Sequence, residues 1–276
     1  MKAPMTPEEY LKRGNLSAAL EALQNQVRKQ PDDPKLRIFL FQLLAVLGQW
    51  DRALTQLNVA GDLDDGALAM VIMYREVLNS EAFREQVFQG QRDPVIFGEP
   101  RQWIALLLQA LKLTATGDDE QAGSIRASAY ERAPAVSGKI DGNAFKWISD
   151  GDSRLGPVLE LIIEGRYLWA PYDQIQAITL ESPEDLRDCV WMPAHLQWSN
   201  GGESYGVIPT RYPDSQRQED TLLALSRKTV WEKRGEDAYI GLGQRMLMTD
   251  QGEYPLMDAR SIEFDASIST DSPESG

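Results

Sequence analysis

A repeated pattern of small and large residues constrains the first half of this chain. The segment RGNLSAALEAL, with Gly14 and Ala19, is followed thirty-four positions later by LGQWDRALTQL, where Gly48 and Ala53 take the same places. That period is typical of the tetratricopeptide repeat, a helix–turn–helix unit. Glycine suits the tight turn because it tolerates positive φ, and alanine suits a close helix crossing. The sequence therefore predicts stacked helix pairs.

A third, weaker copy lies at residues 117–134, where Gly117 and Ala122 keep the spacing of the first copy. The copy that belongs between them, around Ala82 and Phe83, has no glycine. A helical bundle with a chance similarity is the alternative. The pattern predicts a loop over residues 90–99 and helices near residues 6–13, 16–30, 35–47, 51–59, 65–78, 80–89, 100–115 and 119–132.

The second half has the pattern of short strands. VLELIIEG and RYLWAP flank a tight-turn signal at Glu164-Gly165, and Asn200-Gly201 marks another hairpin. Five of the seven tryptophans also lie after residue 136, which indicates a differently built half.

We therefore expect an α+β fold with tetratricopeptide-like α-helical repeats over residues 1–135 and a small, mostly antiparallel β domain over residues 136–264. We expect residues 136–148 to join two separately packed units. The acidic, serine-rich residues 265–276 are predicted to be disordered.

The charge is uneven and acidic. The net charge is −14, with 15 Lys+Arg and 18 Asp+Glu in residues 1–135 and 13 and 24 in residues 136–276. This balance argues against DNA, RNA or anionic lipid as the main partner. The sequence has no apolar run near about 18 residues and no signal-peptide stretch at its start. Its single cysteine, Cys189, cannot form an internal disulfide, which favours a reducing compartment.

Residues suited to catalysis are scarce. Cys189 and His195 are the only cysteine and histidine, and on an extended strand they are too far apart to act together unless a bulge or turn at Pro193 brings them closer. We expect Asp150, Asp152 and Arg154 to provide capping and an ion pair at the domain junction rather than an acid–base site. The sequence thus predicts no catalytic residue, no metal and no cofactor.

Four arginines of the second half, Arg154, Arg166, Arg187 and Arg211, are expected to be exposed and to pair with neighbouring acids. Anchoring a partner's carboxylate is the alternative role.

Repeat arrays present a concave surface to partners. The first helix of each pair is expected to line it, and an amphipathic partner helix fits such a groove. Packing in the core is the alternative for the apolar members of the predicted partner-binding set, which is Ile38, Gln42, Val46, Ile72, Glu76, Ile104 and Leu107.

Several runs carry a family resemblance. DSRLGPVLELIIEGRYLWAP, SPEDLRDCVWMPAHLQWSNGGE, VIPTRYPDS and the upstream VIFGEPRQW resemble the ImpE family, also called SciE-type or TagJ, over about residues 7 to 264. The resemblance implies a cytoplasmic accessory protein of a type VI secretion system of a Gram-negative bacterium, without known catalysis. It also implies a partner, the N-terminal helix of the small contractile-sheath subunit, and a link to the ATPase that recycles the sheath.

These observations lead to one functional hypothesis, a non-catalytic adaptor that binds a protein helix. A hydrolase-like enzyme acting through the β domain and a purely structural, self-associating subunit are the alternatives.

Overall fold

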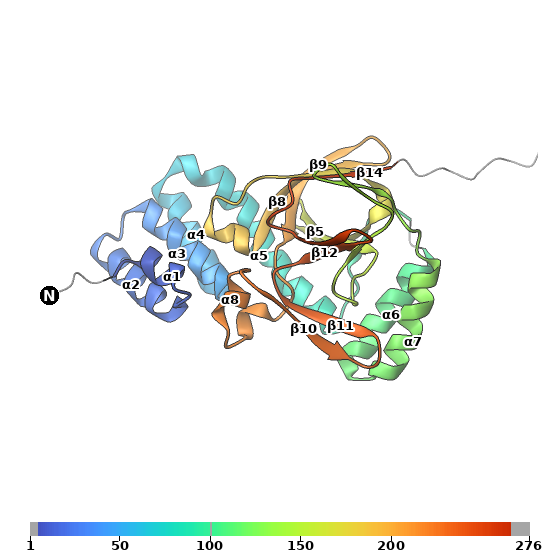
Figure 1. Ribbon diagram of the computed structural model, residues 1–276. Coiled ribbons are helices and arrows are strands. Elements are labelled where there is room, and N and C mark those ends of the chain that lie inside the picture. The colour runs from blue at the N-terminus through green and yellow to red at the C-terminus, as the bar shows by residue number, and fades with distance from the viewer. Residues whose placement is uncertain (1–4, 100, 266–276) are drawn as a thin grey trace, which may run out of the picture.

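The computed structural model describes residues 5–99 and 101–265. Helices occupy one end of the molecule and strands most of the other, with the last helix pair below the strands (Figure 1). The helices are α1 (Pro7–Lys12), α2 (Leu16–Lys29), α3 (Pro34–Val46), α4 (Trp50–Leu63), α5 (Leu68–Phe88), α6 (Gln102–Thr116) and α7 (Asp119–Arg132), with the 3-10 turn η1 (Asp65–Ala67).

The repeat glycines lie where the pattern predicts a turn. Gly14, Gly48 and Gly117 join α1 to α2, α3 to α4 and α6 to α7, with φ of 72°, 67° and 83°. The alanine five residues after each glycine is fully buried, at Ala19, Ala53 and Ala122. The prediction of tetratricopeptide-like helix pairs is confirmed.

The predicted break between residues 65–78 and 80–89 is wrong. Both ranges belong largely to α5, a single helix of 21 residues. No glycine or proline interrupts α5, so nothing in it favours a turn through positive φ. The repeat unit that lost its glycine therefore became one long helix, which crosses from the helical end of the molecule to the strands (Figure 1).

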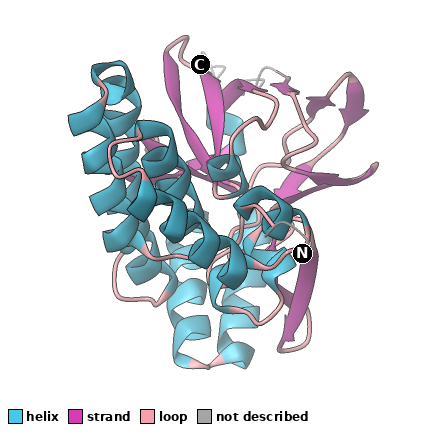
Figure 2. Ribbon diagram, turned by 90° about the vertical axis from the view of Figure 1, so that its left-hand side faces the viewer, coloured by secondary structure: helices cyan, strands magenta, loops and turns pink. Residues whose placement is uncertain are grey.

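A mixed sheet of nine strands packs beside the helices (Figure 2). All of its strand pairs are antiparallel except β1–β6, so the predicted mostly antiparallel domain is confirmed. Its strands, in spatial order, are β1 (Val95–Ile96), β6 (Arg166–Pro171), β5 (Val158–Ile163), β9 (Glu203–Pro209), β8 (Trp191–Trp198), β7 (Ile175–Leu180), β14 (Ser261–Phe264), β2 (Gly138–Ile140) and β3 (Asn143–Phe145).

The segment predicted as a loop, residues 90–99, contains strand β1. Val95 and Ile96 pair in parallel with Leu168 and Trp169, so this connection forms an edge of the sheet. Two residues are too short for a sequence pattern to distinguish a strand from a loop.

Smaller elements complete the second half. β10 (Thr229–Arg234) and β11 (Ala238–Gly243) form a hairpin, and β12 (Met246–Thr249) pairs with β4 (Ile148–Asp150) and β13 (Gly252–Pro255). Short helical segments are η2 (Tyr172–Gln174), η3 (Leu186–Cys189), η4 (Ser215–Arg217) and α8 (Thr221–Ala224). The predicted disorder of residues 265–276 concerns a segment that, from residue 266 on, lies outside the described residues.

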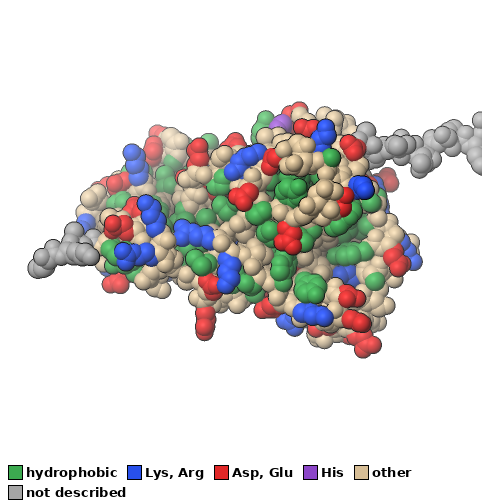
Figure 3. All heavy atoms as spheres, viewed as in Figure 1, with side chains coloured by type: hydrophobic (Ala, Val, Ile, Leu, Met, Phe, Trp, Pro, Cys, Tyr) green, Lys and Arg blue, Asp and Glu red, His purple; other side chains and the backbone are tan. Residues whose placement is uncertain are grey.

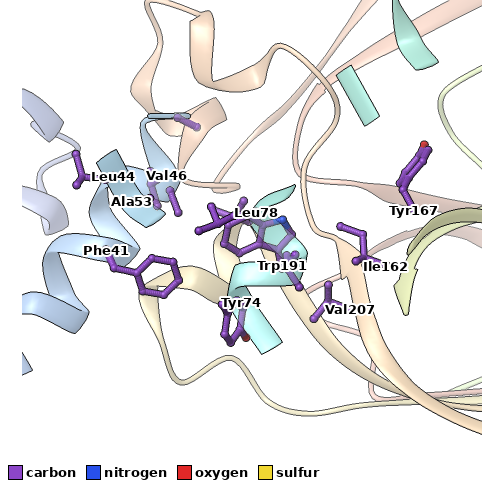
Figure 4. Packing of buried hydrophobic residues seen from close by; sticks show 14 of the residues in the cluster. Phe41, Leu44, Val46, Ala53, Tyr74, Leu78, Ile162, Tyr167, Trp191 and Val207 are labelled. Carbon is purple, nitrogen blue, oxygen red and sulfur yellow. The ribbon is translucent and has the colours of Figure 1, made fainter. Parts of the chain in front are cut away.

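The helices and one face of the sheet share a hydrophobic cluster. The ring centroid of Trp191 in β8 lies 5.9 Å from that of Trp50 in α4 and 5.8 Å from that of Tyr74 in α5. Figure 4 shows Phe41, Tyr74 and Trp191 close together within this cluster. The two halves therefore share an apolar interface, and both the joining segment at residues 136–148 and the division into domains near residue 135 stay predictions.

A buried ion network joins the helices to the sheet. Arg84 of α5 donates to Glu160 of β5 over 2.7 and 3.0 Å, and Arg245 pairs with the same carboxylate and with Asp150. Burial alone raises the pKa of Glu160, but Arg84 and Arg245 lower it to about 2. Burial raises the pKa of Asp150 to about 6, against the lowering effect of Arg245.

Two arginines predicted to be exposed are buried. Arg154 pairs with Asp152 at 2.6 Å, and Arg211 donates to the carbonyl oxygens of Ala45 and Val46, at the end of α3. Arg211 thus satisfies carbonyl groups that a helix end leaves without a partner. Arg154 thus has the acidic partner that we expected, whereas Arg211 has no ion pair among the described residues, and neither side chain is exposed as expected.

Replacing Ala19 or Ala53 with leucine will lower the free energy of unfolding by about 1–3 kcal/mol, because the added side chain overpacks a fully buried crossing. Urea denaturation measures the change. Ala105→Leu, at an exposed position of α6, is the matched control and will have little effect. Normal stability in both buried variants would contradict the repeat register.

Glu160→Gln will destabilise the protein by about 3–5 kcal/mol at pH 7, because it leaves Arg84 and Arg245 without their shared carboxylate. The pKa of Glu160 is lower in the folded chain than its ordinary value of 4.5, so its stabilisation is present above that pH and is lost as the pH falls toward about 2. The difference between the two proteins in urea denaturation will therefore narrow at pH 3. Asp150 titrates in the wild type and in the variant alike, so its effect cancels in the comparison. If the difference in the free energy of unfolding were the same at pH 7 and pH 3, the low pKa of Glu160 would be refuted.

Candidate functional site

The face of the sheet that packs on the helices is only partly covered. Side chains of β8 alternate, with Met192, Ala194 and Leu196 in a second cluster on the opposite face. On the helix face of the same strand, Trp191 is fully buried under α5, whereas Pro193 and His195 are half-buried. The strand thus runs out from beneath the helix and leaves an open strip of sheet.

A groove of about 470 Å³ lies along this strip, between α5 and strands β5, β7, β8 and β9. We call it the α5–sheet groove. Its exposed apolar side chains are Ile72, Met73 and Tyr205, which are 58, 37 and 74% exposed. Helix and sheet each contribute part of the lining, which includes Ala69, Ile72, Met73 and Glu76 from α5 and Thr179, Pro193, His195 and Tyr205 from the sheet.

The α5 side of the groove follows from helical spacing. Ala69, Ile72, Met73 and Glu76 stand at positions i, i+3, i+4 and i+7 and form one stripe. The adjacent stripe of α5, with Tyr74 and other residues, is buried against the shared core. The helix therefore packs on one side and presents the other to the groove.

Of the seven predicted partner-binding residues, the structure brings only Ile72 and Glu76 into the α5–sheet groove. Ile38 is half-buried and packs against the core. The expectation of exposure is wrong for the other four, because helix packing covers that face of α3 and α6; these are Gln42, Val46, Ile104 and Leu107.

Acidic side chains surround the apolar floor. Glu76, Glu164 and Glu181 line the groove and are exposed, and none of them is paired in an ion pair among the described residues. His195 stacks on Tyr205 with ring centroids 4.4 Å apart, and its Nε2 lies 3.1 Å from a carboxylate oxygen of Glu203. The groove therefore combines an apolar floor with a negative rim.

Sequence reasoning missed the sheet side of the groove. One signal was available, because an isolated glycine within a strand marks a close approach of backbones. A Cβ atom on Gly206 would lie 2.5 Å from the carbonyl oxygen of Ile162 in the neighbouring strand. The contribution of β7 and β8, in contrast, depends on where α5 stops covering the sheet, which no local pattern reveals.

The candidate catalytic residues do not form a common site. Cys189 belongs to η3 and His195 to β8, and burial raises the pKa of the Cys189 thiol. A raised pKa disfavours the thiolate that a nucleophile requires. Asp150 and Asp152 are held by Arg245 and Arg154 in the buried network, as the structural interpretation predicted.

The described residues contain no group of three or more His, Cys, Asp or Glu side chains arranged to hold a metal ion. In the same part of the chain, no helix has the length and hydropathy needed to cross a bilayer. On the face in Figure 3, acidic and basic side chains are interspersed with exposed hydrophobic ones over both parts of the molecule.

Similarity to known proteins extends over nearly the whole chain. Residues 142–263 match the family described as ImpE protein, and residues 10–71 match a tetratricopeptide repeat family. A crystal structure of a protein from Vibrio parahaemolyticus has a TM-score of 0.86 at 24% identity, over 95% of this chain and 98% of that chain. At this identity the likeness concerns the fold alone.

A curated relative is more similar in sequence. The Type VI secretion system accessory component TagJ from Pseudomonas aeruginosa is 49% identical over 261 residues, which cover 95% of this chain and 92% of the relative. Because the match has this identity over almost the full length of both proteins, the chain belongs to the ImpE family, which includes TagJ.

Proposed function

We propose that this protein is a non-catalytic adaptor of a type VI secretion system, and that it binds an amphipathic helix of the small contractile-sheath subunit in the α5–sheet groove. The assignment to a type VI secretion system rests on the name of the curated relative. The sheath helix and a link to the ATPase that recycles the sheath come from the family resemblance, and both belong to this proposal.

The single observation that carries the proposal is the strip of sheet that the helices leave uncovered. A partner helix lying beside α5 would continue the helix layer over β7, β8 and β9. It would bury the exposed side chains of Ile72, Met73 and Tyr205. Aromatic side chains in such positions are frequent anchors of protein interfaces.

The acidic rim of the α5–sheet groove favours a positively charged partner. Glu76, Glu164 and Glu181 surround the groove, so a helix with Lys or Arg beside its apolar face complements it. These exposed charges are screened by salt, so the affinity of such a helix will fall as ionic strength rises.

Ile72→Arg and Tyr205→Ala will each weaken binding of a synthetic N-terminal helix of the sheath subunit by about tenfold or more, because each removes an apolar anchor. Calorimetric titration measures the dissociation constant. Both residues are exposed, so the variants will keep the fold and the melting temperature.

Matched controls carry the same changes outside the groove. Leu222→Arg and Tyr239→Ala alter residues that are 39 and 46% exposed on α8 and β11, and they will bind the helix like the wild type. No binding to the folded wild type would refute helix binding. Binding that persists unchanged in both groove variants would refute the site.

A further inference from the structure

Arg126 of α7 forms the fewest side-chain hydrogen bonds and ion pairs of the buried arginines among the described residues. Five arginines there are buried, and three of them form ion pairs with Asp or Glu: Arg84, Arg154 and Arg245. Arg211 donates to three backbone carbonyl groups. Arg126 is 6% exposed, and its one hydrogen bond within the described residues runs from Nη2 to the hydroxyl of Thr114, at 2.8 Å.

The rest of this guanidinium has no partner among the residues that the structure describes. Its Nε is buried without a hydrogen bond, and no carboxylate forms an ion pair with it. Burial lowers the pKa of Arg126, which is the direction expected where desolvation outweighs attraction to neighbouring acids. A buried cation without a direct ion pair costs stability, and a carboxylate supplied by a ligand would offset that cost.

Arg126 lines an open cleft. The cleft has a volume of about 500 Å³ and lies between α7 and the β10–β11 hairpin, which Figure 1 shows side by side. We call it the α7–hairpin cleft. Small side chains keep it open: Ala127 is exposed, and a Cβ atom on Gly123 would have no neighbour within 4 Å.

The mouth of this cleft is acidic. Asp119 and Glu120 begin α7, and Glu236 and Asp237 form the hairpin turn. Arg234, which is exposed and lies 3.8 Å from Glu232, also lines the cleft. The four carboxylates outnumber the two guanidinium groups and repel a free anion, whereas the buried guanidinium of Arg126 attracts one. A ligand that satisfies both has a carboxylate for Arg126 and positive charges on either side of it.

We propose that the α7–hairpin cleft binds a protein segment in which one acidic residue, flanked by Lys or Arg, places its carboxylate on Arg126. Guanidinium and carboxylate form a charge-assisted, directional pair, and the flanking cations meet the acidic mouth. The cleft shares no lining residue with the α5–sheet groove, so the protein has a second docking surface that does not depend on the sheath helix.

The peptide acetyl-Lys-Ala-Glu-Ala-Lys-amide tests the chemistry on the full chain. We expect it to shift the NMR signal of the Arg126 Nε–H group in a saturable manner, and we expect the peptide with Gln in place of Glu to bind at least about tenfold more weakly. Ala127→Trp, which fills the cleft and leaves Arg126 in place, will abolish the shift. Equal binding of both peptides, or no saturable shift up to about 10 mM, overturns the proposal.

Stability gives an independent comparison. Arg154 has the same burial as Arg126, at 7% exposed, but it has Asp152 as a partner. Arg154→Met will lower the melting temperature, because it leaves Asp152 unpaired. Arg126→Met will leave the melting temperature unchanged or raise it. A comparable fall in both variants would make Arg126 a structural residue and overturn the proposal.

Discussion

The carboxylate of Glu160 connects the two halves of the molecule. Glu160 is fully buried in β5, accepts from Arg84 of α5, and pairs with Arg245, which comes 85 residues later. Tyr167 donates to the same carboxylate at 2.5 Å. A buried carboxylate is stable only where cations and donors surround it, so helix and sheet have to approach in one relative position.

This fixed position determines the α5–sheet groove. Residues of α5 that face the core are held by Trp191, which donates to Glu81 at 2.8 Å, and by the pair of Arg84 with Glu160. The stripe of α5 that lines the groove then stands at a set distance from the uncovered strip of sheet. A groove built in this way exists before a partner arrives, which reduces the ordering that binding requires.

Local chemistry made much of the fold predictable. The spacing of Gly14, Gly48 and Gly117 predicted the turns of the helix pairs, and all three glycines adopt positive φ. Turn signals at Gly165 and Gly201 predicted the hairpins. The groove was predictable only at Ile72 and Glu76, because helical periodicity shows that a stripe is apolar but not which element covers it. Val46 and Leu107 have the same apolar character as Ile72, and their burial depends on tertiary packing. The buried arginines were missed for the same reason.

The strand order has a consequence for biosynthesis. β14 is the last of the described strands, yet it lies inside the sheet, between β7 and β2. Until β14 has been synthesised, β2 and β7 therefore have no common neighbour in the sheet. Glu160 likewise lacks one of its two arginine partners until Arg245 has been synthesised. The helix pairs are synthesised before most of the strands but share their hydrophobic core with residues as late as Leu225, so the nascent helices expose apolar surface until that segment has been made.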